Sequence, residues 1–104
     1  MYVDDLVRGL IALMESGDEL NCTPVNLGNP QEYTIMGWAK VVGRFIAEET
    51  SCKQVPIECI AASTDDPKQR KPDICRAKEL LDWEPVVPVI EGVRKTVAYF
   101  ASTL

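Results

Sequence analysis

Apolar residues recur at the spacing of an α-helix in four separate stretches of this 104-residue chain, and this periodicity limits the fold more than any other feature. The stretches predict helices over residues 4–15, 34–49, 73–83 and 88–101. Each predicted helix carries an apolar stripe wide enough to be buried along one side. Four such stripes in so short a chain predict a mostly helical domain.

Residues that favour helix starts stand at the beginning of each stretch. Asp4 or Asp5 is placed to accept hydrogen bonds from the free N–H groups of the first helix. Thr34 and Asp73 are placed to do the same for the second and third helices. Pro88 suits the first turn of the last helix, because the N–H that proline lacks is not needed there. These positions predict where the four helices begin.

Two short segments have the pattern of β-strands. Residues 25–27 end at a Gly28-Asn29-Pro30 turn signal, and residues 54–60 alternate well enough for a strand that Pro56 confines to an edge or a strand start. With the helix between them, the two segments form a βαβ unit with parallel strands and a right-handed crossover. We therefore predict an α/β fold: a small, mostly helical lobe with four helices and a short two-stranded parallel sheet.

The predicted sheet is too small to cover four apolar stripes. Two parallel strands are marginal on their own, and parallel sheets normally have both faces covered. Apolar faces that remain uncovered usually mark contact with another domain or partner. We therefore expect residues 1–104 to be one lobe of a larger protein, that is, an incomplete domain.

Charge and composition exclude several functions. Eleven Lys and Arg against sixteen Asp and Glu give a net charge of −5, which argues against nucleic-acid and anionic-membrane partners. No apolar run approaches the roughly 20 residues that span a bilayer. The chain has no histidine, so Ser-His-Asp catalysis and imidazole metal sites are excluded within it. We expect no metal site.

The four cysteines show no metal or redox spacing. No CxxC pair occurs among them, and we expect them to be small, mostly buried thiols, although two disulfides are arithmetically possible. They are Cys22, Cys52, Cys59 and Cys75.

Two places in the sequence favour a ligand. Arg70 precedes the Asp73 helix start by three residues, so a guanidinium and free helix N–H groups could meet an anion from two sides. The alternative is a solvated surface loop of mixed charge. Asn26 lies near the end of the first predicted strand, where ligands bind in open α/β sheets. The alternative there is a strand followed by a turn.

Three blocks of the sequence carry recognisable motifs. They are Tyr-Val-Asp-Asp-Leu-Val-x-Gly-Leu from residue 2, Pro-Val-Asn-Leu-Gly-Asn-Pro from residue 24, and Asp-Asp-Pro-Lys-Gln-Arg-Lys-Pro-Asp-Ile from residue 65, the last followed by Trp83-Glu84-Pro85. The first two resemble the C-terminal third of the extended short-chain dehydrogenase/reductases and are shared across many nucleotide-sugar enzymes. The third is more specific, and with it the chain resembles the UDP-glucuronate decarboxylases, also called UDP-xylose synthases.

The resemblance implies a lobe that closes over a UDP-sugar bound on a Rossmann domain of the same parent chain. In this family NAD oxidises the sugar at C4, the β-keto acid loses CO2, and the ketone is reduced again. Arg70 matches the family's arginine, which contacts the substrate's anionic groups and assists decarboxylation. The glycine-rich NAD loop and the catalytic Tyr-x-x-x-Lys are absent from this sequence. We therefore expect NAD to bind the Rossmann domain and this chain alone to be inactive.

The resemblance further implies a homodimeric parent. From its charge and the lack of a long apolar run, we expect no membrane contact from this segment. It places animal forms in the Golgi lumen, with a cytoplasmic location as the alternative. Two other functions remain open from the residues. One is a catalytically dead stand-alone interaction module, and the other is the same lobe of a sibling nucleotide-sugar dehydratase or epimerase.

Overall fold

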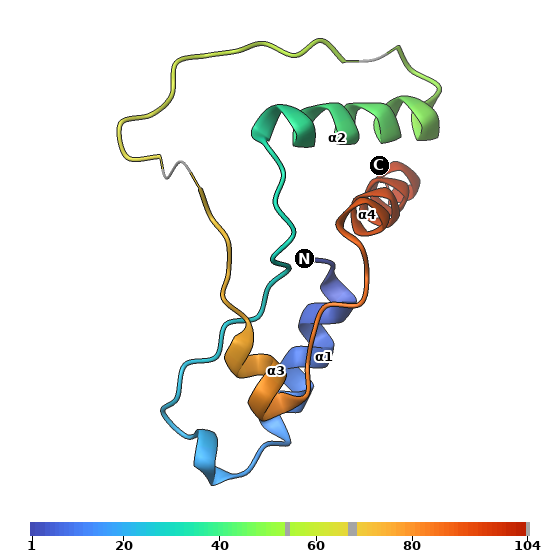
Figure 1. Cartoon of the computed structure of the whole chain (residues 1–104). Coiled ribbons are helices and arrows are strands. Elements are labelled where there is room, and N and C mark those ends of the chain that lie inside the picture. The colour runs from blue at the N-terminus through green and yellow to red at the C-terminus, as the bar shows by residue number, and fades with distance from the viewer. Residues whose placement is uncertain (54, 67–68, 104) are drawn as a thin grey trace. The chain divides into compact units, whose positions relative to one another are not determined.

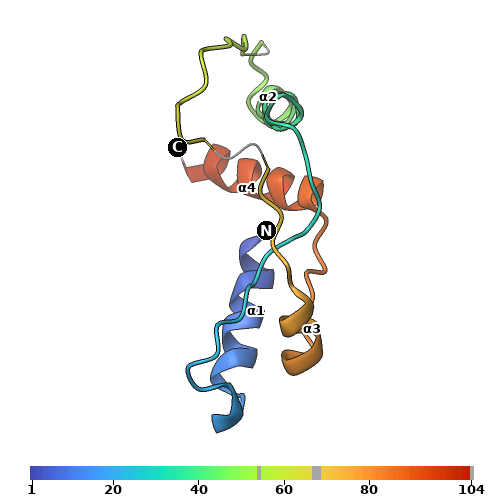
Figure 2. The ribbon, with the colours of Figure 1, turned by 60° about the vertical axis from the view of Figure 1, so that its left-hand side comes forward.

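The computed structural model describes residues 1–53, 55–66 and 69–103, which divide into two compact units. The first unit comprises Met1–Gln31 and Lys71–Gly92, and the second comprises Glu32–Arg70 and Val93–Leu104. Figures 1 and 2 show the elements from two directions. The elements are α1 (Val3–Met14), the 3-10 turn η1 (Asp18–Leu20), α2 (Ile35–Thr50), α3 (Cys75–Leu81) and α4 (Val89–Thr103).

The core of the first unit surrounds Trp83, whose side chain is only 1% exposed. Helices α1 and α3 pack together here, and the indole Nε1 of Trp83 donates to the carbonyl of Asp5, with 2.9 Å between the two atoms. This hydrogen bond satisfies the one polar atom of the indole, so the ring can be buried without leaving a donor unpaired. The other core residues are Ile74 and Ala77, with Val25, Leu27 and Leu81 packed against them.

Two glycines of the first unit lie where the chain approaches itself closely. A Cβ built on Gly9 would lie 2.8 Å from Leu27 Cδ1, and one built on Gly28 would lie 2.7 Å from Pro72 Cγ. Both distances are shorter than van der Waals contact, so a side chain at either position would force its neighbour away. Gly9 therefore allows α1 to pack closely against Leu27. Gly28 allows its own segment to pack closely against Pro72, in the segment before α3.

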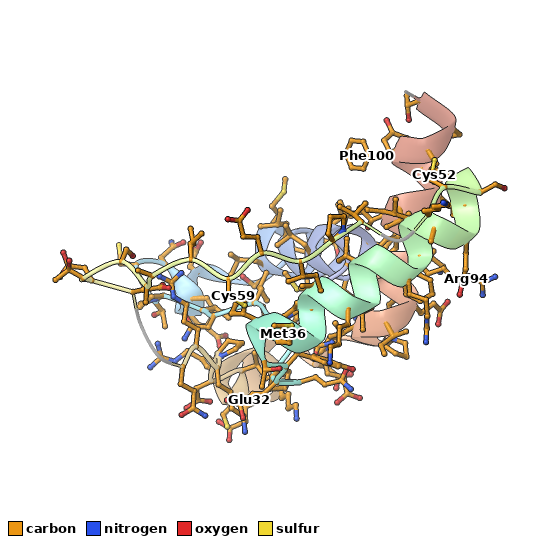
Figure 3. The ribbon with its side chains drawn as sticks, turned by 90° about the horizontal axis from the view of Figure 1, so that it is seen from above. Glu32, Met36, Cys52, Cys59, Arg94 and Phe100 are labelled. Atoms are coloured by element: carbon orange, nitrogen blue, oxygen red, sulfur yellow. The ribbon has the colours of Figure 1, made fainter. Side chains whose placement is uncertain are left out.

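The second unit contains α2 and most of α4. Thr34 is the N-cap of α2, and its Oγ1 accepts a hydrogen bond from Gly37 N at 2.9 Å. Phe45 is the buried residue of α2, with 4% of its surface exposed. Beyond Cys52, the described residues up to Arg70 have no helix or strand and are exposed (Figure 3).

The four predicted helices are confirmed, with corrections to their starts. Thr34 begins α2 as predicted. The residue before α3 is Ile74 and not Asp73, although Asp73 Oδ1 accepts from Cys75 N at 3.0 Å, and Pro88 directly precedes α4 instead of lying in its first turn. The prediction that Asp4 or Asp5 caps α1 is wrong. The residue before α1 is Tyr2, which makes no side-chain capping bond, and the Asp5 carboxylate instead turns toward a distant segment of the chain.

The predicted two-stranded parallel sheet is wrong. No strand occurs among the residues that the structure describes, so the observed fold is a small helical one and not a βαβ unit. Residues 25–27 form neither a helix nor a strand, and they pack through Val25 and Leu27 on the Trp83 core. Residues 55–60 belong to the other unit and are all exposed; residue 54 lies outside the described part. A strand needs a neighbouring backbone to pair with, and the described residues of the two segments form no such ladder.

The expectation of buried cysteines is also wrong. All four thiols are free and exposed: three stand outside the helices, and Cys75 is the first residue of α3. Within the described ranges, no helix is long and apolar enough to cross a membrane.

Candidate functional site

Arg70 is the last residue of one segment of the second unit, and its side chain is exposed. The preceding residue, Gln69, donates from Nε2 to Glu32 Oε1 at 2.7 Å, which ties this end of the exposed segment to the residues leading into α2. Arg70 therefore follows a residue whose side chain is held by a hydrogen bond. Asn26, the other predicted site residue, belongs to the first unit. The two predicted site residues therefore lie in different units.

Asn26 meets the segment that begins α3. Its Nδ2 donates to the carbonyl of Asp73 at 3.3 Å, although the two residues are 47 positions apart. The hydrogen bond from Cys75 N–H holds the pKa of the Asp73 carboxyl below its usual 3.8. The Asp73 carboxylate in turn raises the pKa of the Cys75 thiol above its usual 9.0. This thiol is therefore protonated at neutral pH and is a poor nucleophile.

A pocket of about 400 Å³ lies beside this contact. Arg76 lines it, but its Nη1 donates to the Pro24 carbonyl at 2.6 Å and ties α3 to residues 24–26. The pocket also presents the acidic side chains of Asp73 and Glu79. With its cation engaged by the backbone and two carboxylates exposed, this pocket suits a hydroxyl-rich or cationic group better than an anion.

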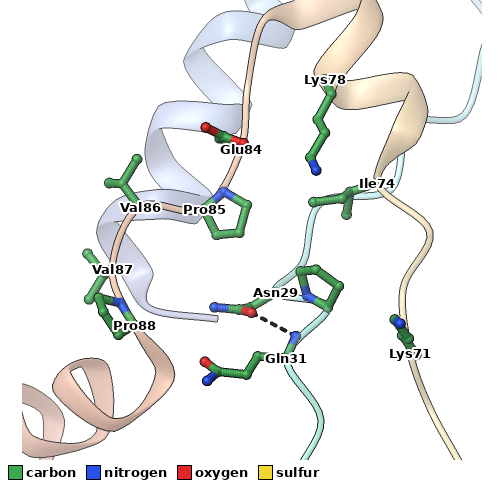
Figure 4. Close-up of a pocket in the computed structure, with 11 residues that line it drawn as sticks. Asn29, Gln31, Lys71, Ile74, Lys78, Glu84, Pro85, Val86, Val87 and Pro88 are labelled. Carbon is green, nitrogen blue, oxygen red and sulfur yellow. Dashed lines mark hydrogen bonds between the residues drawn. The ribbon is translucent and has the colours of Figure 1, made fainter.

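A larger pocket of about 600 Å³ lies elsewhere in the first unit, and sequence reasoning missed it. Figure 4 shows Lys78 extending from α3 into the space beside the 84–88 segment, with Asn29 and Gln31 across from it. Lys71 also lines the pocket, directly after Arg70 in the sequence. Periodicity could not reveal this pocket, because its walls come from residues 29–31 and from residues 71–88, which are far apart in the chain.

One wall of this larger pocket is held in place by Asp5, which is 1% exposed. Its two carboxylate oxygens accept from Val86 N at 3.1 Å and from Val87 N at 3.0 Å, and Arg8 Nη2 donates to Oδ1 at 3.0 Å. The same Arg8 nitrogen donates to the carbonyl of Glu84 at 2.6 Å. Residues 84–87 are therefore fastened to α1 by a buried carboxylate whose two oxygens are both hydrogen-bonded.

Burial of Asp5 would raise the pKa of its carboxyl, since desolvation disfavours the charged form. The hydrogen bonds from Val86, Val87 and Arg8 outweigh that effect and hold the pKa below its usual 3.8. Asp5 is therefore ionised at neutral pH and acts as a structural acceptor, with no proton to donate.

The described residues contain no cluster of three or more Cys, Asp or Glu side chains that could hold a metal ion. The two pockets of the first unit are lined by amides, ammonium groups and carboxylates, which can bind a polar ligand through hydrogen bonds.

The comparisons with known proteins give one consistent answer. No family model matches the sequence. UDP-glucuronic acid decarboxylase 1 of Danio rerio is 46% identical over 103 residues, and that of Xenopus tropicalis is 47% identical over 103 residues. UDP-glucuronic acid decarboxylase 6 of Arabidopsis thaliana is 46% identical over 92 residues. The chain is a homologue of one part of the UDP-glucuronic acid decarboxylases.

The similarity to the decarboxylases runs over nearly the whole chain but over little of each relative. It covers 99% of this chain and 23% of the Danio rerio and Xenopus tropicalis proteins. The chain thus spans about a quarter of the length of these decarboxylases. The family resemblance read from the sequence motifs is confirmed, while the substrate-binding roles of Arg70 and Asn26 stay predictions.

Proposed function

We propose that this chain is the substrate-binding part of an NAD-dependent decarboxylase that converts UDP-glucuronate to UDP-xylose and CO2. The observation that carries the proposal is the 46–47% identity to decarboxylases over 99% of the chain. In the proposed enzyme, residues 1–104 form the lobe that contacts the nucleotide sugar. The compartment is that of the whole enzyme, the Golgi lumen, with the cytoplasm as the alternative.

The residues of this chain supply charge and shape, and the redox chemistry comes from elsewhere in the enzyme. NAD, when bound, would supply the hydride acceptor for oxidation at the sugar C4 and the hydride donor for the later reduction. This sequence has no glycine-rich dinucleotide loop to hold NAD, so the residues that bind it belong to another part of the enzyme. Here the Arg70 guanidinium binds an anionic group of the substrate and stabilises the enolate charge that develops as CO2 leaves.

The isolated 104-residue chain is expected to bind no NAD and to release no CO2 from UDP-glucuronate. Neither a dinucleotide loop nor a Tyr-x-x-x-Lys pair occurs in its sequence, so it lacks both the cofactor site and the general base. Calorimetric titration with NAD and a CO2-release assay measure the two properties. Saturable NAD binding in the micromolar range would refute the proposal that cofactor binding lies outside this chain.

An exposed apolar face on α1 favours the second candidate, a stand-alone interaction module. Five apolar side chains at helical spacing along α1 are all at least 46% exposed: Val3, Val7, Leu10, Ile11 and Met14. In the decarboxylase proposal this face is covered by the rest of the enzyme, since about three quarters of each relative's length lies outside the matched part. In the interaction-module alternative the chain is a stable monomer that reserves this face for a partner.

The two candidates differ in how the isolated chain behaves. We expect it to self-associate through α1, and Val7→Lys should shift it toward the monomer because a charge on that face opposes burial. Val55→Lys is the matched control, since Val55 is 55% exposed against 47% for Val7 and lies in the other unit. Analytical ultracentrifugation at several concentrations measures the effect. A wild-type monomer at high concentration with a sharp, reversible unfolding transition would favour the interaction module.

A further inference from the structure

Cationic side chains are scarce in the first unit, and half of them line one pocket. The unit holds four Lys and Arg against ten Asp and Glu. Arg8 is paired with Asp5, and Arg76 donates to the Pro24 carbonyl. The remaining two, Lys71 and Lys78, both line the 600 Å³ pocket, and neither forms an ion pair within this unit. In this acidic unit, the two cationic side chains that form no ion pair therefore line the same pocket.

The two amide side chains of the pocket present donors rather than acceptors. Asn29 Oδ1 accepts from Gln31 N at 2.9 Å, as the dashed line in Figure 4 shows, and Gln31 Oε1 accepts from Val89 N at 3.4 Å. Because each amide oxygen is engaged by a backbone N–H, the NH2 group of each is left as a donor at the pocket wall. Together with the two ammonium groups, they give the pocket four donor groups from separate side chains.

We propose that this pocket binds an oxyanion, a phosphate or carboxylate group, between the ammonium groups of Lys71 and Lys78 and the amides of Asn29 and Gln31. Charge-assisted hydrogen bonds from ammonium groups to such oxygens are stronger than bonds between neutral groups. Glu84, which also lines the pocket, is the one carboxylate there and opposes an anion. The pocket lies wholly within the first unit, so the proposal is independent of the decarboxylase function.

An NMR titration of the full chain with inorganic phosphate tests the proposal. The side-chain amide signals of Asn29 and Gln31 are expected to shift saturably, whereas chloride at the same ionic strength should produce no saturation. Malonate in a parallel titration tells whether phosphate or carboxylate oxygens bind more tightly, and saturation by either supports the site. Absence of saturation with both, or equal shifts with chloride, would overturn the proposal.

Three variants locate the binding. Lys78→Gln should raise the dissociation constant about fivefold, since one charged donor is lost from an exposed site. Glu84→Gln should lower it about twofold, because it removes the opposing carboxylate. Lys40→Gln, an exposed lysine on α2 in the other unit, is the control and should leave it unchanged. If Lys40→Gln weakens binding as much as Lys78→Gln does, the anion is attracted by overall charge and the pocket assignment is wrong.

Discussion

Replacement of Asp5 by alanine is expected to lower the free energy of unfolding of the first unit by about 3 kcal/mol. The carboxylate is buried and accepts from Val86 N, Val87 N and Arg8. Its removal leaves two backbone N–H groups without their acceptors and releases Val86 and Val87 from α1. Urea unfolding followed by circular dichroism measures the loss.

The neighbouring acid provides a matched control. Asp4 is the same residue type one position earlier in α1, but its side chain is exposed. Asp4→Ala should therefore change the free energy of unfolding by no more than about 0.5 kcal/mol, as substitutions on solvated surfaces usually do. Equal effects of the two substitutions would show that acidic charge in the first turn, and not the contacts of Asp5 with Val86 and Val87, stabilises the unit.

The stability that Asp5 provides should depend on pH in a definite direction. Its folded pKa lies below the usual 3.8, so the folded state favours the ionised form relative to the unfolded chain. The contribution is complete at pH values above 3.8 and is lost as the pH falls through the lower folded pKa. The difference in unfolding free energy between wild type and Asp5→Asn should accordingly shrink below that pH. A difference that stays constant as the pH is lowered well past 3.8 would contradict the lowered pKa.

Helix positions were predictable because their causes are local. The spacing of apolar residues and the Thr34 hydroxyl lie within one or two turns of the backbone they organise, so the sequence shows both at once. The role of Asp5 was not predictable in this way. Asp4 and Asp5 look equivalent at a helix start, and what distinguishes them is contact with Val86 and Val87, about 80 residues away.

The strand prediction failed for a related reason. Val25 and Leu27 have the alternation of a strand because both pack on the Trp83 core, and alternation reports burial of one face without specifying a paired backbone. The candidate site also contains one part that the sequence predicts and one part that it does not. The motif around Arg70 could be recognised from sequence, whereas the pocket lined by Lys71 and Lys78 depends on how distant segments meet.

Arg70→Ala is expected to lower kcat/KM for UDP-glucuronate by at least about tenfold, equivalent to about 1.4 kcal/mol of transition-state stabilisation. The host for this measurement is the Danio rerio decarboxylase with its matching 103 residues exchanged for this chain. The guanidinium binds an anion through two parallel hydrogen bonds, so Arg70→Lys should restore little of the loss.

Arg44→Ala is the control for loss of a positive charge. Arg44 lies in the same unit as Arg70, is exposed on α2 and pairs with Glu48 at 3.6 Å. An exposed pair of this kind contributes little, so its removal should leave kcat/KM within about twofold of the parent value. Thermal melts of each variant establish that the exchanged enzyme is folded. A second control, Lys68→Ala, removes a positive charge two residues before Arg70 and should cost little. Lys68 lies outside the part of the chain that the structure describes.

CO2 release from UDP-glucuronate by this exchanged enzyme at saturating NAD, measured for the unsubstituted form and for Arg70→Ala, tests the decarboxylase proposal most directly. We expect NAD-dependent CO2 release with UDP-xylose as the product, and a kcat/KM for Arg70→Ala at least about tenfold below that of the unsubstituted form. Arg44→Ala should stay within about twofold of the unsubstituted form. Equal kcat/KM values for Arg70→Ala and Arg44→Ala would contradict the role assigned to Arg70. A folded exchanged enzyme that releases no CO2 would contradict the proposal that this chain serves a UDP-glucuronate decarboxylase.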